Sequence, residues 1–166
     1  MTDENDALGT MEKAHGCWIA HLQRRIDHPP AQVWAMLTEP AKFVEWLAPG
    51  EIELKKGGKA RLDFVESHIV IDSEVTACMP GKRLEYSWSS PGEPERPVRW
   101  DLSEADGGTL LNLTLTTPEE EDAARSCAGW EAHLMMLLAA IEGVPIKFPF
   151  ERFQSTRTEY GKMLTG

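Results

Sequence analysis

The chain has 166 residues, of which 42% are hydrophobic and 27% charged, values typical of one globular domain. Its formal net charge of −10 disfavours nucleic acid and anionic membranes as partners, because both would repel it. No run of about 18 apolar residues predicts a membrane span. The three cysteines form no CxxC pair and the acidic N-terminus is not shaped like a signal peptide, which together predict free thiols and a cytoplasmic protein.

Residues 1–16 contain few large apolar side chains, so we expect a mobile N-terminal tail. Alternation from Cys17 to Asp27 then predicts a strand, with Arg24 as the one charged side chain on its inward face. Two short helices should follow, because Pro30 and Pro40 suit first helical positions. Pro49-Gly50 marks the end of the second helix.

Between residues 51 and 115, about six segments alternate between apolar and polar side chains. They are separated by turn signals such as Gly57-Gly58, Pro80-Gly81 and Gly107-Gly108. Consecutive strands with short turns are typical of an antiparallel meander. Together with the first strand, the pattern predicts an antiparallel sheet of six to seven strands.

A long amphipathic helix is expected after the last strand. Thr117 can cap it, Pro118 suits its first position and Glu120 completes a capping box. Its apolar stripe consists of Cys127, Trp130, Leu134, Leu137, Leu138 and Ile141. Gly143 and Pro145 should end it near Glu142. We expect residues 144–166 to form a C-terminal extension packed on the domain of residues 17–143.

The order of these elements predicts an α+β fold. A twisted antiparallel sheet of this length curls, and its concave face needs a cover. The long C-terminal helix is the only predicted element large enough to supply one. We therefore expect a curved sheet wrapped around that helix.

The order of elements and several motifs resemble a known family. The motifs are Arg24-Arg25-Ile26-Asp27-His28-Pro29-Pro30, Val33-Trp34, Leu37-Thr38-Glu39-Pro40, Trp46, Gly57-Gly58, Met79-Pro80-Gly81-Lys82-Arg83-Leu84, Trp88, Val98, Trp100, Gly107-Gly108-Thr109 and Gly129-Trp130 with Leu134 and Leu137. Over residues 17–143 the chain is similar to the helix-grip fold of the START-like (SRPBCC) superfamily. Within it, the chain resembles the C-terminal-domain family of the activator of the heat-shock-protein ATPase. The resemblance implies the fold more firmly than an activity.

The sequence gives little indication of metal or nucleophilic chemistry. The five histidines make no HxxH or HExxH motif, so neither a metal nor a cofactor is expected. His133 is interpreted as a partly exposed helix residue. Cys127 and His133 lie on different faces of the predicted helix and cannot pair with each other, so Cys127 is interpreted as a small buried hydrophobe.

A set of large side chains points, by phase, to the space between sheet and helix. The candidate ligand-binding residues are Arg24, Trp46, Phe64, Ile71, Tyr86, Trp88, Trp100, Leu113, Trp130 and Leu134. They could line a pocket or fill it as core. The leading hypothesis is a non-catalytic protein, monomeric or homodimeric, that binds a small hydrophobic molecule, with Arg24 or Tyr86 fixing its polar end. The alternatives are a cochaperone-like module that contacts a chaperone or another protein, as in a stress response, and a cyclase- or aromatase-type enzyme.

Overall fold

The computed structural model describes residues 7–165 and contains one antiparallel sheet. Its strands are β1 (Thr10–Ala14), β2 (Cys17–Ile26), β3 (Gly50–Ile52), β4 (Lys59–Phe64), β5 (Ile69–Met79), β6 (Arg83–Ser87), β7 (Pro97–Ala105) and β8 (Gly108–Pro118). They lie in the order β1-β2-β8-β7-β6-β5-β4-β3. The meander from β3 to β8 is therefore closed by β2, which pairs with β8 along its whole length, and β1 forms the edge beyond it.

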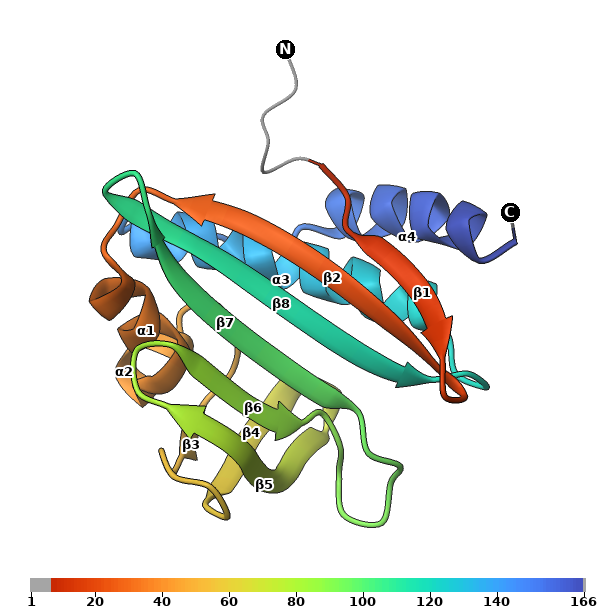
Figure 1. The fold of residues 1–166 in the computed structure, drawn as a ribbon, viewed down its shortest axis with the longest axis horizontal. Helices are drawn as coiled ribbons and strands as arrows, with labels where there is room; N and C mark the ends of the chain where they lie inside the picture. Colours follow the sequence, from red (N-terminus) through yellow and green to blue (C-terminus); the bar gives the residue numbers. More distant parts are fainter. Residues whose placement is uncertain (1–6, 166) are drawn as a thin grey trace.

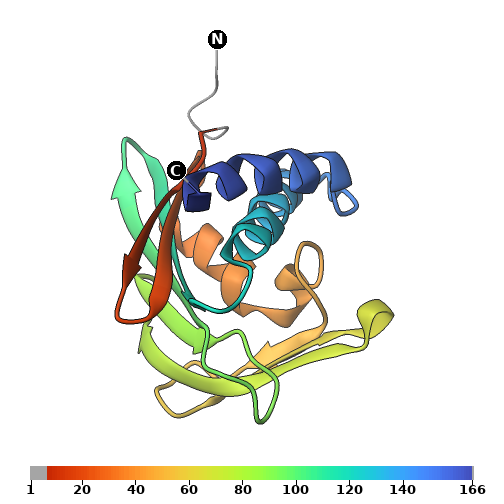
Figure 2. The same cartoon turned by 90° about the vertical axis from the view of Figure 1, so that its right-hand side faces the viewer.

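The helices lie on one side of this curved sheet (Figure 1). They are α1 (Pro30–Thr38), α2 (Pro40–Phe43), α3 (Ala123–Ile141) and α4 (Phe150–Thr165), and the 3-10 turn η2 (Val65–Ser67) lies between β4 and β5. In Figure 2 the helix α3 lies within the concavity of the sheet and α4 lies on its outer side. The predicted α+β helix-grip fold is confirmed, including two short helices that each begin at a proline.

The sheet has eight strands, not six to seven, because residues 10–14 form β1. The expectation of a mobile tail is therefore wrong for these residues, while residues 1–6 lie outside the described chain. His15 and Gly16 connect β1 to β2 with positive φ values of 53° and 76°. Two such residues make the hairpin turn whose twist matches antiparallel strands. Sequence reasoning missed β1 because Met11 is its one large apolar side chain.

The long helix begins later than the capping pattern predicts. Strand β8 continues to Pro118, and Thr117 pairs with Trp18 rather than capping a helix. The cap is Asp122, whose carboxylate accepts a hydrogen bond from the backbone N–H of Arg125 at 3.0 Å. Continued pairing with β2 therefore outweighs the local helix signal at residues 117–120. The helix ends at Ile141, where Gly143 adopts φ +80°, a conformation that glycine tolerates without strain.

One strand changes its inward face part-way along. The pairing of β5 with β6 shifts register between Val75 and Ala77, and Cys78 then lies opposite Leu84 and packs against the core. A bulge of this kind lets two residues oppose one. The side chains of β5 that face the core therefore change phase beyond Val75. In the described chain no helix is long and apolar enough to span a membrane.

Candidate functional site

A row of tryptophans runs through the space between the sheet and α3. Trp46 contacts Trp100 edge-on with ring centroids 5.9 Å apart, and Trp100 contacts Trp130 of α3 at 5.5 Å. Trp130 in turn meets Trp88, which follows β6, at 4.7 Å. Edge-to-face pairs at these separations stabilise a core beyond the area they bury.

One end of this row is solid core. Six of the predicted binding residues are 1–2% exposed, namely Trp46, Ile71, Tyr86, Trp100, Leu113 and Leu134. The Trp46 indole N–H donates to the carbonyl of Met36 at 2.8 Å. Burial raises the pKa of Tyr86 to about 12, so its hydroxyl stays neutral. Of the two possibilities left open by the sequence, these six side chains fill this end of the space as core.

The other end of the row is only partly covered. Here Phe64, Trp88, Trp130, His133 and Phe148 form a group that we call the aromatic mouth. Trp88 contacts Phe64 at 5.7 Å, and His133 contacts Phe64, Trp130 and Phe148 at 6.1, 5.8 and 5.6 Å. Trp130 is 4% exposed, whereas the other four residues are partly exposed. Phe64, Trp88 and Trp130 of the predicted set thus lie together here.

His133 is the polar group of the mouth. Its Nδ1 atom lies 3.0 Å from the backbone oxygen of Trp46. Burial lowers the pKa of the ring, and the hydrogen bond with Trp46 only partly opposes this effect. The imidazole is therefore neutral near pH 7, because a lowered pKa lies below the ordinary histidine value of about 6.5.

A narrow crevice opens beside the Trp88–Trp130 pair. Its volume is about 10 Å³, and its walls include Arg96, Val98, Leu115 and Ser126 as well as the two tryptophans. That volume is about what one water molecule requires. A larger hollow of about 290 Å³ lies elsewhere, around Gly9, His21, Gln23 and Asn112. His21 and Gln23 are exposed residues of β2, so this hollow belongs to the outer face of the sheet rather than to the mouth.

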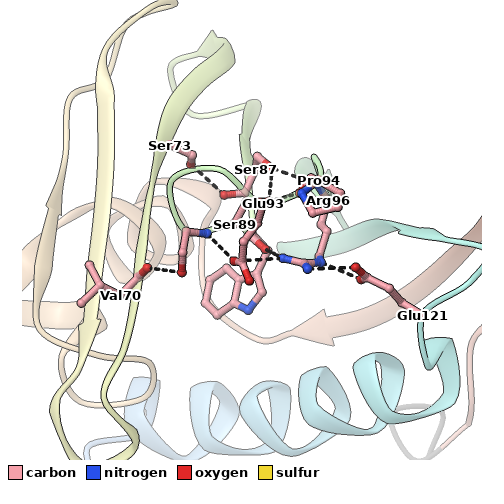
Figure 3. A network of polar contacts seen from close by, with 10 residues as sticks. Val70, Ser73, Ser87, Ser89, Glu93, Pro94, Arg96 and Glu121 are labelled. Atoms are coloured by element: carbon pink, nitrogen blue, oxygen red, sulfur yellow. Dashed lines mark hydrogen bonds and ion pairs between the residues drawn. The ribbon is translucent and has the colours of Figure 1, made fainter.

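The wall of the mouth that follows β6 is held by a dense polar network (Figure 3). Ser90 donates to the carbonyl of Val70 at 2.7 Å and Ser89 to that of Pro94 at 2.5 Å. Arg96 donates two hydrogen bonds to Glu121, at 2.6 and 2.9 Å, and one to the carbonyl of Trp88 at 3.1 Å. Paired guanidinium–carboxylate bonds of this type fix geometry as well as adding stability. The backbone around Trp88 is therefore anchored to both β5 and the start of α3.

The opposite wall is held much more loosely. It is the segment between α3 and α4, which places Phe148 against His133 at 5.6 Å and Phe153 at 5.8 Å. Within the described chain, no backbone hydrogen bond involves residues 145–148. Val144 and Ile146 in this segment are 62% and 40% exposed. Few backbone hydrogen bonds and exposed apolar side chains are features of segments that open at low free-energy cost.

Arg24 lies outside the mouth, in a buried charged cluster. Its guanidinium hydrogen-bonds Glu131 of α3, to which Arg152 and Tyr160 of α4 also donate at 3.1 and 2.6 Å. The Tyr160 hydroxyl accepts from the backbone N–H of Gly9 at 2.8 Å. Burial and the neighbouring Glu131 raise the pKa of the Cys127 thiol to about 12, which makes it inert. The cluster joins β2, α3 and α4, and the contacts of Arg24 are internal to the protein.

Sequence reasoning missed His133, Phe148 and Glu131 as members of these two groups. The partner of His133 is a backbone oxygen 87 positions away, which no local pattern reveals. Phe148 follows the helix-ending Gly143 and belongs to no periodic segment. Glu131 lies four residues after Cys127 of the apolar stripe, so its position on the inward face of the helix was the one detectable signal. Among the described residues, no group of three or more histidine, cysteine, aspartate or glutamate side chains could hold a metal ion.

Comparison with known proteins agrees with this architecture. The family described as "Activator of Hsp90 ATPase homolog 1-like protein" matches residues 27–142. A conserved protein of unknown function from Enterococcus faecalis has 24% sequence identity and a TM-score of 0.80, with 97% of this chain and 92% of that one covered. CalU16 from Micromonospora echinospora has 24% sequence identity and a TM-score of 0.77, with 95% of this chain and 96% of CalU16 covered.

A third solved structure is that of DynU16, described as a protein in the dynemicin biosynthetic locus. It is 27% identical with a TM-score of 0.70, and the alignment covers 76% of this chain and 48% of DynU16. No curated protein matches the sequence.

Proposed function

Because the chain belongs to the Activator of Hsp90 ATPase homolog 1-like family, whose fold encloses one helix in a curved sheet, we propose that it binds a small planar hydrophobic molecule at the aromatic mouth. The observation that carries the proposal is the contrast along the tryptophan row, which is solid at Trp46 and Trp100 but partly exposed at Trp88. Sites for small molecules are typically concave, apolar and aromatic, with few polar groups.

The ligand would enter by displacing Phe148. The crevice of about 10 Å³ beside Trp88 and Trp130 is too small for an aromatic molecule, and neither His133 nor Phe148 lines it, so a ligand at the mouth needs a ring of the mouth to move. The wall that follows β6 is anchored by Arg96 and Glu121 at 2.6 Å, whereas residues 145–148 have no backbone hydrogen bonds in the described chain. A flat ligand can replace the Phe148 ring against His133 and keep an aromatic contact there. The location of DynU16 in a biosynthetic locus agrees with a small-molecule ligand.

Binding is tested with planar aromatic probes of two to four fused rings. Thermal unfolding should shift upward with probe concentration, because a ligand that binds only the folded state stabilises it by mass action. Isothermal titration calorimetry then gives the affinity for the strongest probe. Trp88→Ala should remove the heat of binding. The matched control is Trp18→Phe, since Trp18 contacts Lys13 of β1 at 5.9 Å rather than the mouth, and it should bind as the wild type does.

Absence of any stabilisation across the set would contradict the proposal. Binding that survives Trp88→Ala would show a site elsewhere and would contradict the location.

A further inference from the structure

The tautomer of His133 follows from its hydrogen bond. Nδ1 lies 3.0 Å from the backbone oxygen of Trp46, and a carbonyl oxygen can only accept. Nδ1 must therefore carry the proton. In a neutral imidazole with a protonated Nδ1, the Nε2 atom has a free lone pair and acts only as an acceptor.

Within the described chain, nothing donates to that lone pair. The aromatic neighbours of the ring are Phe64, Trp130 and Phe148, which contact it through their own rings. Among the described residues, only Nε of Arg99 is a side-chain nitrogen or oxygen that is both fully buried and without a hydrogen-bond partner. Nε2 of His133 also has no partner, so it cannot be fully buried. Nε2 of His133 is thus an unpartnered acceptor that is not sealed inside the protein. It belongs to the ring from which Phe148 would be displaced.

We infer that Nε2 of His133 accepts a hydrogen bond from the ligand, so that the mouth selects planar aromatic molecules carrying a hydroxyl group over their O-methyl ethers. This inference rests on the proposed function. Its physical basis is that a buried acceptor left without a donor costs free energy, so an ether that excludes water from Nε2 without replacing it binds more weakly. A phenol, in contrast, satisfies the acceptor and keeps its ring against Trp130 and Phe64.

The test compares β-naphthol with β-naphthyl methyl ether, which share one ring system. Calorimetry on the wild type should give an affinity about five- to tenfold higher for the naphthol, as expected for one net hydrogen bond of about 1 kcal/mol. His133→Phe retains an aromatic ring and removes the acceptor. It should bind both probes with equal affinity, close to that of the wild type for the ether.

Three results would overturn the inference. Equal binding of the two probes by the wild type would leave the proposed function intact and refute the role of Nε2. A preference for naphthol that persists in His133→Phe would place the acceptor on another residue. Binding of neither probe would refute the inference, and would refute the proposed function as well if no larger probe of the set binds. Should His133→Phe fail to fold, the NMR shift of Nε2 in the wild type decides, because an acceptor nitrogen that gains a hydrogen bond moves upfield, so Nε2 must lie further upfield with naphthol bound than with the ether bound.

Discussion

The two ends of the tryptophan row differ in how their polar edges are used. At the solid end, Trp46 donates to the carbonyl of Met36 at 2.8 Å, and Trp46 and Trp100 are each 1% exposed. At the mouth, no described residue accepts from the Trp88 indole, and His133 has one ring nitrogen paired and one unpaired. The same residue type is therefore enclosed core at one end of the row and partly accessible at the other.

The largest expected effect falls on the solid end. Trp100→Ala should lower the free energy of unfolding by about 3–5 kcal/mol, because it empties a site that is fully enclosed. Chemical denaturation followed by circular dichroism measures this change. A loss below about 1 kcal/mol would mean that this end is not the packed core that its 1% exposure indicates.

Trp88→Ala should cost less stability than Trp100→Ala, about 1–3 kcal/mol, because part of the Trp88 side chain already faces solvent. Trp88→Ala should, however, weaken ligand binding more than Trp100→Ala does. Measuring both variants by denaturation and by calorimetry with the same probe separates the two roles. The comparison fails if Trp88→Ala is the more destabilising substitution.

Phe148→Ala should change stability by less than about 1 kcal/mol, since residues 145–148 have no backbone hydrogen bond within the described chain and the nearby Val144 and Ile146 are exposed. It should raise affinity for an aromatic probe, because the ring that competes for the face of His133 is gone. Phe150→Ala is the matched control: Phe150 is 68% exposed and contacts Phe148 at 5.0 Å. Weaker binding by Phe148→Ala would show that this ring is part of the site rather than its cover.

The smallest effect concerns pH. Burial lowers the pKa of His133 in the folded protein, so below about pH 6.5 the unfolded chain binds a proton that the folded state resists. Stability should therefore fall as pH drops through this range. Subtracting the denaturation profile of His133→Phe from that of the wild type isolates this contribution. A difference that does not vary between about pH 5 and 7 would show that His133 titrates normally.

The sequence predicted what alternation and composition encode, and missed what depends on distant partners. The strands from β4 to β8 follow from period-two patterns, and the stripe from Cys127 to Ile141 identifies α3. The edge strand β1 was missed because its apolar pattern is weak, and the start of α3 because pairing with β2 outcompetes a local cap. The role of Arg24 depends on Glu131, which lies 107 positions away.

The predicted binding residues fall into an enclosed group and a partly exposed group, and the sequence could not separate the two. Phase shows which side chains point inward but not how deeply they are buried, so Trp88 and Trp100 were indistinguishable in sequence. Only the three-dimensional arrangement separates a ring enclosed on all sides from one at the edge. Phe148 had no periodic pattern to mark it.

The most direct test of the account is where an aromatic probe binds. Intermolecular nuclear Overhauser effects between β-naphthol and the protein should connect the probe to the side chains of Trp88 and His133. The contacts between Phe148 and His133 should disappear as the probe is added. Contacts to Gly9, His21 and Asn112 on the outer face of the sheet instead, with the Phe148–His133 contacts preserved, would contradict it.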